Sequence, residues 1–152
     1  MVERFERFIC AISEVSRLWH KIATDEMVQY GLKGAHAIYL VAMYRLKDGV
    51  TAAQLCEVCA KDKSDVSRAM SLMEKQGIIM REGVGKNLYR ARLTLTEKGK
   101  AAAEQVRARA AVAVEMAGKN LTDANRNIFY ESLDLITNNL REVSKKGFDS
   151  LN

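Results

Sequence analysis

The sequence has no proline and only nine glycines among its 152 residues. Because these two residue types interrupt helices and mark turns, their scarcity favours helices joined by short loops. No apolar run approaches the roughly 18 residues that a membrane-spanning helix needs. The first residues include acidic side chains where a secretory leader would be basic and then apolar, so we expect neither a membrane span nor a leader. Only three cysteines are present, which excludes a disulfide framework and predicts a cytoplasmic location.

What the sequence does contain fits a small globular protein of one domain or two closely packed lobes. Hydrophobic residues make up 48% of the chain, enough to build a sizeable core. Lys and Arg number 24 against 19 Asp and Glu, which gives a net charge of +5 and favours an anionic partner.

The first half of the chain predicts a long amphipathic helix followed by a buried one. Apolar residues recur at three-and-four spacing through residues 2–29, on one stripe that needs a packing partner. These residues are Phe5, Phe8, Ile9, Ile12, Val15, Trp19, Ile22 and Ala23. Residues 31–34 break the pattern, and residues 35–46 are apolar on most faces, as expected of a central helix.

Two short helices and a hairpin are predicted next. Thr51 and Gln54 form a capping box that begins a helix over residues 52–60. A second helix is capped by Asp62 or Ser64 and ends at Gly77. Residues 78–82 and 88–95 resemble strands, and the glycines between them permit a hairpin turn.

Two long helices complete the predicted order. Thr96 can cap a helix whose alanine-rich part covers residues 101–117, and Thr122 can cap a last helix that ends near residues 145–147. Residues 148–152 are expected to fray. The fold class is therefore mainly α with a small β-hairpin.

Two short helices followed at once by a hairpin are the components of a winged helix-turn-helix, whose second helix enters the DNA major groove. The charge supports this interpretation. Residues 61–92 hold eight basic and four acidic residues, a net of +4, whereas the other 120 residues hold only +1. Nearly all the excess positive charge thus lies on the segment that would meet DNA phosphates.

The second short helix supplies the candidate DNA-reading residues. If Val66, Met70 and Met73 face inward, a set of mostly short polar side chains faces outward: Lys63, Ser64, Asp65, Ser67, Arg68 and Ser71. Arg68 can form a bidentate contact with guanine, and the serines can bond base edges or phosphates. At the hairpin tip, Lys86, Asn87 and Arg90 are candidates for the adjacent minor groove or its phosphates.

At this point the sequence resembles the MarR family of winged-helix transcription regulators. The resemblance rests on residues 51–55, on 65–68 with 73–78, and on 95–99, which read TAAQL, DVSR, MEKQGI and LTEKG. It implies a winged helix-turn-helix region at 35–96, with a recognition helix over about 63–76 and a wing over about 78–95. It also implies a helical dimerisation region made of residues 1–34 and 97–147.

By the same resemblance, an intertwined homodimer would place two recognition helices in successive major grooves of a pseudo-palindromic double-stranded DNA operator. The wing departs from the family pattern, because many members carry an Asp-x-Arg-Arg run where residues 85–90 read GKNLYR. Either Lys86 or Arg90 would then take the role of the wing arginine, or the protein would make a weaker or differently placed minor-groove contact.

Other chemistry-bearing residues leave alternatives open. Cys56 and Cys59 lack a second ligand pair, His20 and His36 lack metal-ligand spacing, and no metal or cofactor is predicted. Cys10 lies away from the apolar stripe, where it would act in redox sensing or remain an ordinary thiol at the dimer contact. A set of aromatic side chains could border the pocket where family members bind aromatic effectors or simply pack the helical junction: Trp19, His20, Tyr30, His36 and Tyr39.

No phosphate loop, nucleophile elbow or catalytic carboxylate pair is recognisable, so the sequence does not predict an enzyme. We expect a homodimeric, effector-released repressor. The alternatives are a redox switch through Cys10 and a winged-helix module whose basic face binds an acidic protein.

Overall fold

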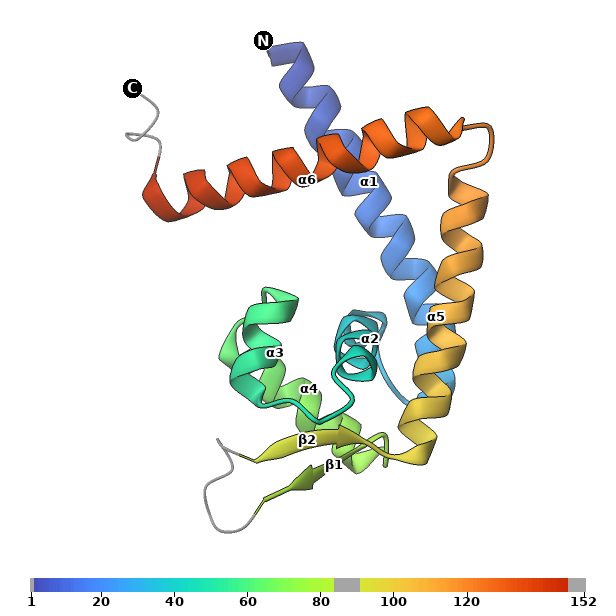
Figure 1. Cartoon of the computed structure of the whole chain (residues 1–152), viewed down its shortest axis with the longest axis vertical. Helices are drawn as coiled ribbons and strands as arrows, with labels where there is room; N and C mark the ends of the chain where they lie inside the picture. Colours follow the sequence, from blue (N-terminus) through green and yellow to red (C-terminus); the bar gives the residue numbers. More distant parts are fainter. Residues whose placement is uncertain (1, 84–90, 148–152) are drawn as a thin grey trace. The chain divides into compact units, whose positions relative to one another are not determined.

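The computed structural model describes residues 2–83 and 91–147, which form two compact units, the first extending to Ala111 and the second beginning at Val112. Figure 1 shows the chain as helices with a single two-stranded hairpin. This arrangement confirms the predicted fold class. The predicted hairpin-tip residues Lys86, Asn87 and Arg90, and the tail at 148–152, lie outside the described residues.

The order of elements follows the sequence closely. The helices are α1 (Val2–Met27), α2 (Ala37–Arg45), α3 (Ala52–Cys59), α4 (Lys63–Lys75), α5 (Glu97–Ala117) and α6 (Asp123–Lys146), and the strands are β1 (Ile79–Glu82) and β2 (Arg92–Leu95). Two short 3-10 turns, η1 (Val28–Tyr30) and η2 (Gly34–His36), separate α1 from α2. Both α1 and α2 are shorter than predicted. The chain between them forms the two turns, with Gly31 in a left-handed conformation (φ of 68°) between them.

Side-chain caps fix the two helices of the helix-turn-helix. Thr51 Oγ1 accepts a hydrogen bond from the amide of Gln54, whose side chain accepts in return from the amide of Thr51, so the predicted capping box is confirmed. Asp62, one of the two predicted alternatives, is the cap of α4, since its Oδ1 accepts from the amide of Asp65 at 2.8 Å. Between the helices the chain turns at Ala60, which adopts a left-handed φ of 51°.

The hairpin follows α4 directly. At Gly77 the chain takes a φ of 68°, and the next amide, that of Ile78, donates to the carbonyl of Met73 at 2.9 Å. The two strands then pair antiparallel, with Ile79 opposite Leu95. A feature that the sequence did not predict is a bridge from Val50 to Leu93, which ties the segment before α3 to the hairpin.

One hydrophobic core holds the first unit together. The largest fully buried side chains come from α1, α2, α3, α4 and the hairpin with its neighbouring segments: Tyr39, Met27, Leu40, Leu55, Met70, Met73, Ile78, Leu93, Val50 and Val66. Ala102 and Ala103 of α5 are also fully buried, so the start of the alanine-rich helix packs closely on this core. The exposed surface of α4 is thus backed by a rigid base.

The second unit contains the end of α5 and the whole of α6. Thr122 Oγ1 accepts from the amide of Asn125, which confirms the predicted cap of α6. The guanidinium of Arg126 lies 3.5 Å from a carboxylate oxygen of Glu115 and holds the turn between these helices. None of the helices in the described ranges has the length and apolarity that crossing a membrane requires.

Candidate nucleic-acid interface

The exposed face of α4 is the candidate DNA-reading surface. Val66, Ala69, Met70 and Met73 are buried, which fixes the rotation of the helix about its axis. Five of the six predicted outward residues are exposed on the opposite side, and we refer to them as the α4 face: Lys63, Ser64, Ser67, Arg68 and Ser71. Short serines flank the single arginine, so the backbone of α4 can approach a groove without steric obstruction.

Arg68 is the single arginine of the α4 face, and its side chain is largely exposed. Its Nη1 donates to Ser64 Oγ at 2.7 Å, and its Nη2 lies 3.9 Å from a carboxylate oxygen of Asp65. The Arg68 side chain nevertheless remains 73% exposed. Exposed contacts of this kind are weak, so the guanidinium can exchange them for a bidentate contact with a base.

Asp65 does not face outward as predicted. Its side chain is half-buried, and its Oδ2 accepts a hydrogen bond from the hydroxyl of Tyr39 at 3.0 Å. Burial, together with this hydrogen bond to the carboxylate, raises the pKa of Tyr39 well above its ordinary range, so the tyrosine remains a donor. Asp65 therefore links α4 to α2 through one carboxylate oxygen, while its side chain stays 41% exposed beside Arg68.

The far end of α4 is tied to the hairpin. Arg81 Nε of β1 donates to Glu74 Oε2 of α4 at 2.7 Å, and the Arg81 side chain is only 23% exposed. After the hairpin, Lys98 Nζ donates to the carbonyl of Gln76 at 2.8 Å. These contacts fix the position of the strands relative to the candidate recognition helix. The pairing of Arg81 with Glu74 could not be predicted from the sequence, because the two residues lie in different elements and no local signal marks the contact.

A second feature of the same unit is an apolar cavity of about 370 Å³. It lies between α1, α2 and α5, and its lining comprises Trp19, His20, Ile22, Ala23, Glu26, Gly34, Ala35, Ala37, Ile38, Val41, Lys61, Val106, Arg109 and Ala110. We refer to it as the α1–α5 cavity. Glu26 is paired with Arg109 at 3.3 Å, and Lys61 is a further basic residue of the lining.

Only two of the five aromatic residues predicted to border a pocket line this cavity, namely Trp19 and His20. Tyr39 is instead part of the core, and the Tyr30 hydroxyl donates to Gln105 Oε1 at 2.7 Å. His36 Nδ1 accepts from the amide of Lys33, and burial lowers the pKa of His36, which favours the neutral ring that this bond requires. Lys61 and Arg109 were not predicted as pocket residues, because they come to line the same cavity only in the folded chain.

The cysteines occupy three different environments. Cys10 is exposed on α1, as the sequence predicts, and Cys56 is half-buried. Cys59 is buried, and burial raises the pKa of its thiol, which disfavours the reactive thiolate. Within residues 2–83 and 91–147, no cluster of three or more His, Cys, Asp or Glu side chains could hold a metal ion.

Comparison with known proteins identifies the architecture. Residues 30–87 match the sequence model of the MarR family. A MarR-family transcriptional regulator from Listeria monocytogenes, in complex with a 26mer DNA, superposes with a TM-score of 0.80 at 25% identity over 91% of this chain and 94% of its own. A MarR regulator from Methanosarcina mazei Go1 gives a TM-score of 0.78 at 23% identity, with 91% and 92% covered.

A further structural match is CouR from Rhodococcus jostii RHA1 bound to p-coumaroyl-CoA, with a TM-score of 0.69 at 20% identity and 83% and 88% of the two chains covered. The search of curated protein sequences gave no match. The helix-turn-helix and hairpin define a winged-helix protein. Residues 30–87 are similar to the MarR family model, and the chain has the fold of MarR-family transcriptional regulators over about nine tenths of its length.

Proposed function

We propose that the protein is a homodimeric repressor that binds a pseudo-palindromic DNA operator through α4 and is released by a small aromatic effector. The observation that carries this proposal is the α4 face, an exposed polar surface with one arginine on a helix that the core holds rigidly. Its Listeria relative at 25% identity is a DNA complex, which supports the same type of ligand.

The α4 face has the chemistry of a base-reading surface. A guanidinium is the best donor to the O6 and N7 acceptors of guanine, and Arg68 has the required exposure. Ser64, Ser67 and Ser71 can donate to bases or phosphates. The net +4 charge of residues 61–92 supplies the non-specific attraction to the DNA backbone.

A homodimer is supported by the exposed apolar stripe of α1. Phe5 is 63% exposed, Ile12 is 44% exposed and Val15 is 64% exposed on a helix of 26 residues. A contiguous apolar surface of this extent is typical of a protein interface. A symmetric dimer would present two α4 helices to half-sites about 34 Å apart, one helical turn of DNA.

The α1–α5 cavity is the proposed effector site. Its walls suit an aromatic body, and Lys61 suits an acidic or phenolic substituent. Lys61 directly precedes Asp62, the cap of α4, so a ligand that contacts Lys61 acts on the start of the recognition helix. Such a ligand would release DNA if it bound the DNA-free arrangement more tightly than the DNA-bound one.

The proposed function is tested by selecting bound sequences from a random DNA pool and then measuring affinity by fluorescence anisotropy over a salt series. We expect an enriched pseudo-palindrome with half-sites one turn apart. We also expect tighter binding to it than to a scrambled duplex. The logarithm of the binding constant should fall with the logarithm of the salt concentration, with a slope of about −0.9 for each phosphate neutralised. Enrichment of no sequence, together with equal weak binding to both duplexes, would instead favour an interaction module that binds an acidic protein.

A further inference from the structure

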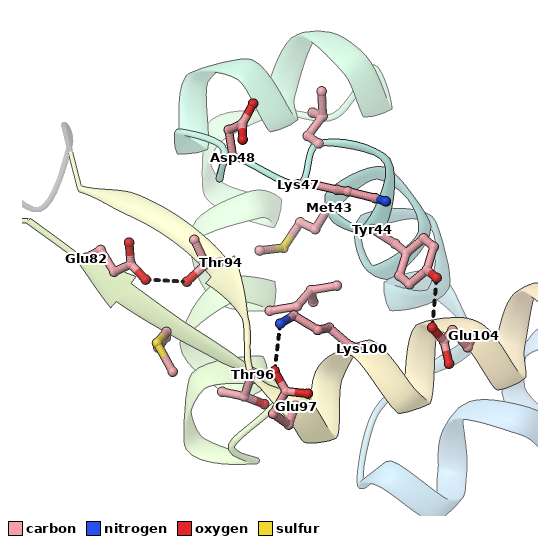
Figure 2. A pocket seen from close by; sticks show the side chains of 13 residues that line it. Met43, Tyr44, Lys47, Asp48, Glu82, Thr94, Thr96, Glu97, Lys100 and Glu104 are labelled. Carbon is pink, nitrogen blue, oxygen red and sulfur yellow. Dashed lines mark hydrogen bonds and ion pairs between the residues drawn. The ribbon is translucent and has the colours of Figure 1, made fainter.

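An unassigned feature of the first unit is an open cleft of about 770 Å³, on the side of the hairpin that faces the end of α2 and the start of α5 (Figure 2). We call it the hairpin cleft. Its lining comprises Met43, Tyr44, Leu46, Lys47, Asp48, Met80, Glu82, Thr94, Leu95, Thr96, Glu97, Lys100 and Glu104. It shares no residue with the α4 face or with the α1–α5 cavity. Its volume lies within the roughly 300–1,000 Å³ of known ligand pockets.

Part of the lining of the hairpin cleft is apolar, and we call this part, made of Met43, Leu46 and Met80, its apolar floor. Met43 is 3% exposed, whereas Leu46 and Met80 are 40% and 45% exposed and so leave apolar surface in contact with water. Burying such surface under an apolar ligand is favourable in proportion to the area covered. The cleft therefore suits a ligand with an apolar body.

The rim of the cleft is acidic, although the chain as a whole is basic. Four carboxylates, those of Asp48, Glu82, Glu97 and Glu104, line the cleft with only two amines, those of Lys47 and Lys100. Lys100 Nζ already lies 2.6 Å from Glu97, so it does not offset the other three carboxylates. The cleft thus has a net charge of −2 in a chain whose net charge is +5.

Two of the acidic side chains, Glu82 and Glu104, are held in place by hydrogen bonds before any ligand arrives. The Tyr44 hydroxyl donates to Glu104 Oε1 at 2.8 Å, and Thr94 Oγ1 donates to Glu82 Oε1 at 3.1 Å, as the dashed lines in Figure 2 show. Each bond uses one oxygen of a carboxylate that can accept several hydrogen bonds, so acceptor capacity remains. A preordered site loses less conformational entropy on binding than a mobile one.

We propose that the hairpin cleft binds a small organic cation with an apolar body. The apolar floor would hold the body, and the carboxylates of Asp48, Glu82 and Glu104 would attract the positive charge. Glu82 and Thr94 belong to the hairpin, while Asp48 and Glu104 belong to segments that the core holds, so a bound cation bridges these two parts. The site is independent of DNA reading and does not rest on the proposed function.

The test is isothermal titration calorimetry of the full chain, without DNA, with tetraphenylphosphonium as the probe. Tetraphenylborate is a control of nearly the same shape and opposite charge. The test variant is the double substitution Asp48→Asn and Glu82→Gln, in which two exposed carboxylates become amides of the same size. Glu57→Gln, which removes an exposed carboxylate from α3 outside the cleft, is the matched control.

We expect one tetraphenylphosphonium ion per chain, a loss of at least about tenfold in affinity in the double variant, and no change in Glu57→Gln. Any tetraphenylborate binding should be insensitive to the double substitution, because it would occur elsewhere on the chain. The proposal is wrong if the wild-type chain does not bind tetraphenylphosphonium, or if the double variant binds it as tightly as the wild type. Unchanged thermal unfolding of the double variant would exclude misfolding as the cause of a loss.

Discussion

Replacing Gly99 with alanine is expected to lower the free energy of unfolding by about 2–3 kcal/mol, the upper part of the range for overpacked sites. A Cβ atom on Gly99 would lie 2.0 Å from the carbonyl oxygen of Ile78. That oxygen cannot move freely, since it also accepts hydrogen bonds from the amide and hydroxyl of Thr96. The substitution therefore forces α5 away from the end of the hairpin, and urea unfolding at fixed protein concentration measures the cost.

Gly118→Ala is the matched control for this prediction. The nearest atoms to its Cβ would be those of the Arg126 guanidinium, 2.7 Å away, which is the end of a long side chain and can shift more easily than a backbone oxygen. Intrinsic helix propensity alone favours alanine over glycine by about 1 kcal/mol in a helix interior. A stabilised Gly99→Ala variant would therefore show that propensity outweighs the close approach and that α5 does not pack on Ile78 as described.

Replacing Ile12 with glutamate is expected to dissociate the proposed homodimer and to weaken operator binding by at least about a hundredfold. Ile12 lies in the exposed apolar stripe of α1, so a symmetric interface would bury two new carboxylates, one from each copy. A monomer reaches only one half-site and loses the gain of roughly a hundredfold or more that linked binding provides. Analytical ultracentrifugation measures the dissociation, and fluorescence anisotropy measures the affinity.

Lys21→Glu controls for charge, because it makes α1 more acidic by two charges at an exposed position outside the apolar stripe. We expect this variant to remain dimeric. If Ile12→Glu were still a dimer with wild-type affinity, the stripe of α1 would not form the interface. A protein that is monomeric before any substitution would contradict the proposed homodimer outright.

The sequence predicted the elements well because their signals are local. Thr51 with Gln54, Asp62 and Thr122 each cap a helix through side chains within three residues, and Gly77 ends α4 through its left-handed conformation. The α4 face followed from the spacing of Val66, Met70 and Met73, which is also a local pattern. Capping and periodicity were therefore sufficient to locate α4, the proposed recognition helix.

Features that depend on distant residues could not be predicted in the same way. Asp65 was expected to face outward, but the hydroxyl of Tyr39, 26 positions earlier, holds it half-buried. The predicted pocket residues were chosen because they are aromatic. In the structure Tyr39 instead fills the core, and Lys61, which is not aromatic, lines the cavity. The close contact that requires glycine at position 99 likewise depends on Ile78, in a different element.

The measurement that most directly tests base reading by α4 is the affinity of Arg68→Ala for the selected operator and for single-base variants of each half-site. Arg141→Ala is the control, since it removes an exposed arginine from α6 that also bonds a neighbour one turn away, Asn138. We expect Arg68→Ala to lose about 1–3 kcal/mol on the operator and to lose its preference at one guanine in each half-site, while Arg141→Ala keeps both. An equal loss on every sequence would assign Arg68 to a phosphate, and an unchanged affinity would contradict DNA reading by this helix.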